Sequence, residues 1–233
     1  NKDQLQKTVW TSNDEGDKIQ LMRAFSDTDE GKQIAQSIFD FKVSKRAMNQ
    51  EFAILYRTNA QSRPIEEALR KLNIPYRIYG GISFYQRREI KDLMAYFRLA
   101  INQHDEEALR RVINYPKREI GDTTLDKMIV AAADNDISIW MVLDNLKDFN
   151  LGISARVAER ITEFVNMIKS FSAMVSNYTA YQLGDYIYYT AGIKRELEQD
   201  RTPEGFSRME NIQELLNGLR DFSEKPLDEG IIP

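Results

Sequence analysis

Residues 52–59 read FAILYRTN, and the rest of the chain can be placed around this stretch. Residues 52–56 form a short apolar run, as expected for a β-strand that is covered on both faces. Residues 62–72 then carry a helical pattern, with Ser62 as a possible cap and Pro64 tolerated in the first turn. Tyr76 to Tyr79 is typical of a second strand. The stretch therefore predicts a β-α-β unit.

The residues before this unit extend the same alternation. Ile19 to Phe25 alternates as a strand, and Asp29 to Phe41 places its apolar residues on one helical stripe. The order β-α-β-α-β is the plan of a doubly wound parallel sheet. Three strands make only part of such a sheet. No GxxxxGK[ST] phosphate loop occurs in the chain, so it is not expected to hold a nucleoside triphosphate unaided.

After Gly80 and Gly81 the pattern becomes helical and stays so. Helices are expected from Ile90 to Ile101, from Glu106 to Ile113 and from about Asp122 to Asn135, followed by 138–146, 155–175, 181–191 and 204–222. We therefore predict an α/β fold. A partial parallel sheet with flanking helices occupies residues 1–101, and an all-helical second domain occupies residues 102–233.

The composition excludes several kinds of site. The chain has no Cys and a single histidine, His104, which rules out disulfides, thiolate metal sites, zinc catalysis and histidine-based hydrolase triads. No metal site is predicted from the residues. No apolar run reaches the roughly 18 residues of a membrane span, and the N-terminus lacks a signal-peptide pattern. We expect a cytoplasmic protein without a membrane partner.

Charge is distributed unevenly along the chain. The net charge is −4, but residues 57–118 carry 13 Lys and Arg against 7 Asp and Glu, which leaves 19 against 29 elsewhere. A locally basic segment can bind phosphates even within an acidic protein. The alternative is that these cations are scattered and solvated on helix surfaces.

Tyr56 and Arg57 are the first candidate site. They fall at the carboxyl end of the predicted strand, where ligands bind in parallel sheets. An aromatic face beside a permanent cation suits a base and a phosphate. The alternative is a tyrosine packed on the sheet and an arginine in a surface ion pair.

Two further groups are candidates for nucleic-acid contact. Phe84 and Tyr85 could stack on the bases of a single strand, with Arg87 and Lys91 near the backbone, although an aromatic pair after a Gly-Gly turn is more often core. In the second group, a glycine precedes a helix beside two cations, and its backbone N–H groups could hold a phosphate without reading sequence. An ordinary capped loop is the alternative there. This second group comprises Lys117, Arg118, Ile120, Gly121, Thr123 and Thr124.

Three strings together carry a family resemblance. Residues 52–63, FAILYRTNAQSR, closely resemble the fourth helicase motif of the UvrD/Rep/PcrA family of superfamily one DNA helicases. Residues 80–92 with 96–99 look like the segment that follows it. Residues 114–124 are similar to the stretch where that family has a glycine-isoleucine-glycine turn, with Ile120 and Gly121 kept.

The resemblance implies a fragment of an ATP-dependent 3′ to 5′ DNA helicase. It would comprise the first part of the second RecA-like motor domain, with its parallel sheet, and much of the inserted helical domain. Arg57 would contact the γ-phosphate of ATP bound with Mg²⁺, and Tyr56 would pack on the adenine. The implied partners are single-stranded DNA, duplex DNA at the helical domain, and the missing first motor domain.

The sequence also departs from the family pattern. The phosphate-loop and Mg²⁺-binding motifs are absent, so the chain alone is not expected to hydrolyse ATP. Glu119 stands where the family usually has the first glycine of its turn, which adds a negative charge. Two alternatives stay open: a non-catalytic module that binds DNA or protein, and part of a helicase-nuclease subunit.

Overall fold

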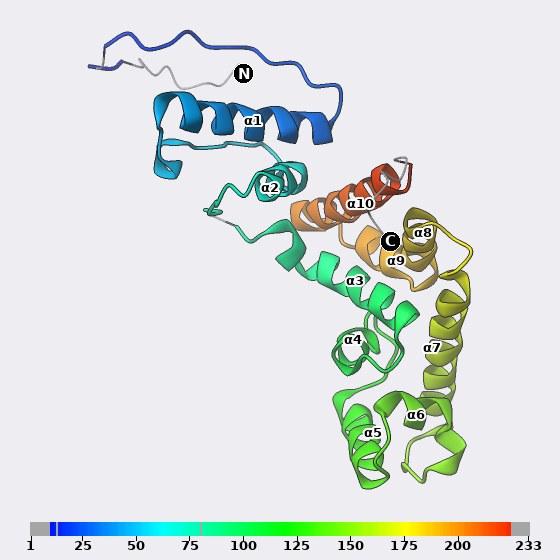
Figure 1. Ribbon diagram of the computed structural model, residues 1–233. Helices are drawn as coiled ribbons and strands as arrows, with labels where there is room; N and C mark the ends of the chain where they lie inside the picture. The colour runs from blue at the N-terminus through cyan, green and yellow to red at the C-terminus, as the bar shows by residue number, and fades with distance from the viewer. Residues whose placement is uncertain (1–9, 13, 80, 225–233) are drawn as a thin grey trace.

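The computed structural model describes residues 10–12, 14–79 and 81–224, and every regular element within them is helical. In Figure 1, α1 and α2 lie at one end, α5 and α6 at the other, and α3 and α7 run between them. The α-helices are α1 Asp27–Lys45, α2 Ser62–Lys71, α3 Arg88–Ile101, α4 Glu106–Val112, α5 Asp122–Asp134, α6 Ile139–Asp144, α7 Ala155–Met174, α8 Ala180–Thr190, α9 Ile193–Gln199 and α10 Pro203–Glu224. Short 3₁₀ helices are η1 Asn49–Glu51, η2 Asn59–Gln61, η3 Phe84–Gln86 and η4 Leu146–Asp148.

The predicted α/β class, with a partial RecA-like parallel sheet, is wrong for the described residues, because none of them forms a strand. A strand needs a hydrogen-bonded neighbour and a covered face. Segments 19–25, 52–56 and 76–79 have no such neighbour here, and only Phe52, Ile54 and Ile78 among their residues are partly buried. Ile19 and Leu55 are 101% and 95% exposed. The strand predicted at 52–56 is therefore wrong, because the described residues supply no hydrogen-bonded partner for it.

Helices α1 and α2 form a small core of their own. Its buried members are Ala35, Ile65, Ala68, Leu69 and Ile74. The two helices cross closely at Gly31, where an added Cβ would lie 2.5 Å from the backbone oxygen of Pro64. Only glycine fits this crossing, since carbon and oxygen atoms cannot approach so closely without displacement.

The remaining helices share one larger core. Helix α3 lies at its centre: Ile90, Leu93, Tyr96 and Leu99 are fully buried against α4, α7, α8 and α10. Phe84 belongs to this core as well. The last buried residue of the smaller core is Ile74, so the chain passes from one core to the other between Ile74 and Phe84. The division that we predict at residue 101 remains a prediction. None of the described helices combines the length and hydropathy needed to cross a bilayer.

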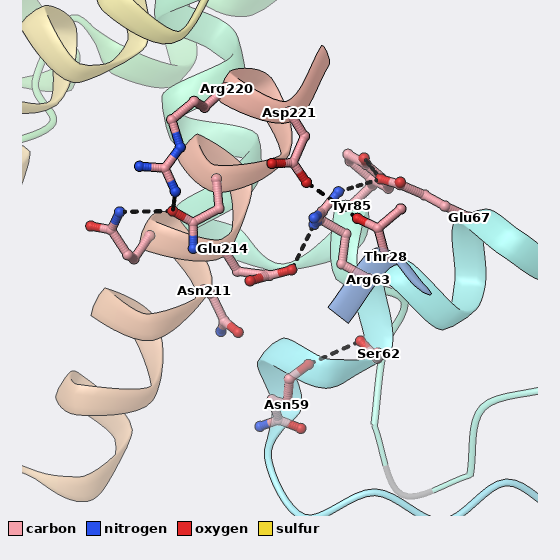
Figure 2. Close-up of polar contacts among 12 residues, drawn as sticks. Thr28, Asn59, Ser62, Arg63, Glu67, Tyr85, Asn211, Glu214, Arg220 and Asp221 are labelled. Atoms are coloured by element: carbon pink, nitrogen blue, oxygen red, sulfur yellow. Dashed lines mark hydrogen bonds and ion pairs between the residues drawn. The ribbon is translucent and has the colours of Figure 1, made fainter. Parts of the chain in front are cut away.

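Buried polar contacts join α2 to α10, as Figure 2 shows. Arg63 reaches from α2 to Glu214 of α10, with Nε 2.9 Å from Oε1, and its Nη1 donates to Glu67 at 2.9 Å. Gly218 makes room for this arginine, because a Cβ there would lie 2.5 Å from Nη1. The last long helix is thereby fixed to the first small core.

Candidate functional site

Tyr56 and Arg57 lie at the end of an extended segment, just before η2. Both are exposed, Tyr56 to 38%, and the described residues offer Arg57 no ion pair. Their position is set through the backbone: Gln61 Oε1 accepts from Arg57 N at 2.9 Å and from Thr58 N at 3.0 Å. The ring and the guanidinium are therefore accessible to a ligand, and the alternative of a surface ion pair for Arg57 is not found among the described residues.

Arg87 lies behind this turn and is only 7% exposed. Its Nη1 donates to the carbonyl oxygen of Asn59 at 2.8 Å and to Asn211 Oδ1 at 2.6 Å, and its Nη2 donates to Ser62 Oγ at 2.9 Å. The guanidinium thus joins η2, the start of α2 and α10. No face of it is open to a nucleic-acid backbone in this structure.

Glu66 organises the segment that leads into α3, a role that the sequence did not reveal. Its carboxylate accepts from Ser83 Oγ, from Phe84 N at 3.0 Å and from Tyr76 Oη at 2.9 Å. Burial by itself would raise the pKa of the Glu66 carboxyl, but these hydrogen bonds outweigh it and the pKa is lowered. The carboxylate therefore stays charged and holds the 83–84 turn against α2. An acidic residue in a helix gives no sequence signal of such a role.

Of the aromatic pair after the glycines, Phe84 lies in the core and Tyr85 is partly buried against it. Phe84 has no exposed surface, and Tyr85 meets it edge to face with ring centroids 5.3 Å apart. Tyr85 also donates its hydroxyl to Glu67 Oε1 at 2.7 Å. Stacking of a base on Phe84 would require its ring to leave the core. Of this group Tyr85 and Lys91 are partly exposed.

Arg118 points inward from the link between α4 and α5. Its guanidinium lies over two aromatic rings, with the guanidinium carbon 5.8 Å from the ring centroid of Tyr96 and 5.4 Å from that of Phe164. Its two terminal nitrogens donate five hydrogen bonds of 2.8 to 3.1 Å, to the carbonyl oxygens of Val112, Tyr115, Pro116 and Ala191 and to the hydroxyl of Tyr96. Arg118 therefore fixes the shape of the link.

The outer side of the same link is accessible. Lys117, Gly121 and Thr123 are exposed, Thr124 is partly buried, and Ile120 is 1% exposed in the core. Gly121 is the N-cap residue of α5, and its oxygen accepts from Thr124 N at 2.9 Å. Backbone N–H groups of the first turn of a helix lack intrahelical partners and favour anions. The outer side of the link therefore presents the Lys117 ammonium group near the backbone N–H groups at the start of α5.

Glu119 adopts a left-handed backbone conformation, with φ 62°, in the middle of this link. Such a conformation favours glycine, the residue that the helicase family usually has at this point. The Glu119 carboxylate lies 2.8 Å from Arg156 Nη2 of α7. The side chain thus places one negative charge beside Lys117 and ties the link to α7.

A pocket of about 350 Å³ opens next to the link. Four cationic side chains and two carboxylates line it, those of Lys117, Arg118, Arg160, Arg195, Glu119 and Glu163. Within the described part of the chain, no ion pair engages Lys117 or Arg195. No three His, Asp or Glu side chains of the described residues are grouped so as to hold a metal ion.

Comparison of the sequence with known proteins assigns the chain to a family. The model of the UvrD-like helicase C-terminal domain matches residues 1–231. The chain is 36% identical over 233 residues to DNA helicase II of Salmonella typhimurium, covering 100% of the chain and 32% of that protein. It is 37% identical over 232 residues to the ATP-dependent DNA helicase PcrA of Bacillus subtilis, covering 100% of the chain and 31% of that protein.

The chain therefore spans about a third of the length of these relatives. The family match covers nearly all of it, including the Tyr56 turn and the link from α4 to α5. By sequence, and with an exposed arginine at the end of the matching motif, this chain belongs to the family of UvrD-like helicase C-terminal domains.

Proposed function

We propose that this chain is part of an ATP-dependent DNA helicase that moves 3′ to 5′ on single-stranded DNA and unwinds duplex DNA. The observation that carries the proposal is the exposed, unpaired guanidinium of Arg57 beside the exposed ring of Tyr56. The printed names of the relatives, DNA helicase II and ATP-dependent DNA helicase PcrA, support it.

In the complete enzyme, Arg57 would approach the γ-phosphate of ATP, and Tyr56 would pack on the base. A cation placed at the transferred phosphoryl group stabilises the charge that develops there. Because the Arg57 side chain has no competing carboxylate among the described residues, it can turn towards a phosphate without breaking a contact. We assign no residue of this chain to Mg²⁺. The ion would accompany ATP on the missing first motor domain.

Replacement of Arg57 in the complete helicase tests this role. We expect Arg57→Ala to lower steady-state ATP turnover by about 10³-fold, the range for arginines that contact a transferred phosphate, with DNA affinity largely kept. Arg110→Ala is the matched control, because Arg110 is an exposed arginine in a surface ion pair with Glu106 at 3.6 Å. Near-normal turnover of Arg57→Ala would refute the role and favour a non-catalytic binding module.

The link between α4 and α5 is our proposed contact with duplex DNA. Lys117 supplies an exposed cation, and the backbone at Gly121 and Thr123 supplies donors at the start of α5. Such contacts bind phosphates without selecting a sequence. We expect Lys117→Ala to weaken duplex binding and to reduce the salt dependence of the affinity by about one phosphate contact. Unchanged affinity at low salt would remove Lys117 from the interface.

A further inference from the structure

We propose that Arg87 is a positioning residue for ATP turnover, acting through Arg57 by fixing the turn at residues 57–62 to helices α3 and α10. The inference rests on the proposed role of Arg57. It differs from the role that the sequence suggested for Arg87, which was contact with a DNA backbone.

One side of the Arg87 contact is the turn itself. The carbonyl oxygen of Asn59 accepts from Arg87 Nη1, and Ser62 Oγ accepts from Nη2, at 2.8 and 2.9 Å. Ser62 in turn donates its hydroxyl to the carbonyl oxygen of Asn59 at 3.0 Å, the bond drawn in Figure 2. The three groups close a ring of hydrogen bonds around the end of η2.

The turn continues without a gap to Arg57. Gln61 precedes Ser62, and its side-chain oxygen accepts from the backbone nitrogens of Arg57 and Thr58. A displacement of Ser62 and Asn59 therefore moves the acceptor that fixes the backbone of Arg57. The Arg57 side chain has no ion pair among the described residues, so its position depends on this backbone.

The other side of the Arg87 contact is the larger core. Asn211 of α10 accepts from Arg87 Nη1 at 2.6 Å and donates from Nδ2 to Glu89 Oε1 at 2.6 Å. Asn211 and Glu89 are 3% and 6% exposed. The guanidinium carbon of Arg87 also lies 5.2 Å from the ring centroid of Phe84. Arg87 is thus held by buried groups of α10 and η3, and Glu89 of α3 in turn holds Asn211.

The geometry explains why arginine is needed. Three acceptors on two terminal nitrogens match the planar fork of a guanidinium, whereas the single ammonium of lysine lies on a flexible stem and cannot span them in the same way. A misplacement of a catalytic group by about 1 Å can cost about 10²-fold in rate. Arg87→Lys should therefore lower turnover while keeping the charge.

A double-mutant cycle in the complete helicase tests the inference, with Arg57→Ala, Arg87→Lys and the double variant compared for ATP turnover at saturating ATP and single-stranded DNA. We expect Arg87→Lys to lower kcat by roughly 10²-fold in the wild-type background and by less than about twofold in the Arg57→Ala background. Arg110→Ala is the control for loss of an arginine on the surface.

Each outcome is decisive. A drop of equal size in both backgrounds would show that Arg87 acts independently of Arg57 and would overturn the inference alone. A wild-type rate for Arg87→Lys would also overturn it. If Arg57→Ala shows the ATP turnover of the wild type, the proposed role of Arg57 is refuted, and the inference about Arg87 is refuted with it. Ser62→Ala removes the acceptor of Nη2 and the hydroxyl bond to Asn59 but leaves Arg87 in place, and it repeats the test should Arg87→Lys not fold. A lower kcat in the wild-type background alone supports the inference, and no change overturns it.

Discussion

Replacing Arg63 with methionine should destabilise the protein strongly, because it would leave a carboxylate buried without its cation. The Arg63 and Glu214 side chains are 6% and 9% exposed, and they join α2 to α10. Breaking a buried ion pair by removing one partner costs about 3 to 5 kcal/mol. The second partner, Glu67, is 29% exposed and keeps the Tyr85 hydroxyl, so its loss adds little. We expect a loss of about 4 kcal/mol in unfolding free energy.

The assay is urea and thermal unfolding of the 233-residue chain followed by circular dichroism. A loss of this size corresponds to a Tm lower by roughly 10 °C for a chain of this length. Arg63→Met with Glu214→Leu should recover most of the loss, since a well-packed apolar pair can replace a buried ion pair. Arg110→Met, which breaks only a surface pair, should change the unfolding free energy by less than about 0.5 kcal/mol.

The same variant should show a characteristic pH dependence. Burial raises the pKa of Glu214, and Arg63 opposes that rise. Without Arg63 the folded-state pKa of Glu214 rises further above its unfolded value. Protonation of Glu214 then stabilises the folded state. This stabilisation is complete when the pH lies below the pKa of Glu214 in the unfolded chain, and it is lost as the pH rises through the pKa of Glu214 in the folded protein. The stability difference from wild type should be smallest below about pH 4.5. A loss under 1 kcal/mol at pH 7, or a double variant as unstable as Arg63→Met, would refute the reasoning.

Three further predictions concern single side chains. Gly31→Ala should lower the unfolding free energy by about 1 to 3 kcal/mol in urea titration, because its Cβ meets a backbone oxygen of α2 at 2.5 Å; an unchanged midpoint would contradict the close crossing. Glu119→Gly should tighten duplex binding several-fold at low salt in fluorescence anisotropy, since it removes a charge beside Lys117 and the strain of φ 62°; equal affinity would count against the proposed interface. Glu66→Gln should destabilise the protein above the ordinary carboxyl pKa, and the difference from wild type should vanish as pH falls through the lowered pKa of the folded state; a difference that is constant from pH 7 to pH 3 in urea midpoints would exclude this role.

The helical pattern predicted the positions of most helices well. The expected segments 62–72, 155–175 and 204–222 lie close to α2, α7 and α10, because apolar residues at helical spacing are buried against neighbours in this chain. The strand predictions failed for the complementary reason. An apolar run such as 52–56 indicates that a segment is covered, but a strand also needs a hydrogen-bonded neighbour, and the described residues provide none.

The candidate site divides in the same way. Tyr56 and Arg57 are predicted from their place at the end of the expected strand, and the structure leaves both exposed, while their role stays a prediction. Arg87 and Arg118 carry the same charge as an exposed DNA contact, and no local pattern indicates that acceptors from distant helices surround each of them. The contacts that decide their orientation join residues 124 and 73 positions apart, which local patterns do not report.

The joint between α2 and α10 also bears on how the protein is made. Arg63 and Glu214 are separated by 151 positions, and Thr28 and Asp221 by 193. During synthesis, at roughly 5 to 20 residues per second, the 151 positions from Arg63 to Glu214 take about 8 to 30 seconds to be translated. In that interval the small core of α1 and α2 has only the segment at residues 83–87 to hold it, through Glu66, Glu67 and Ser62, and it lacks the buried ion pair to α10.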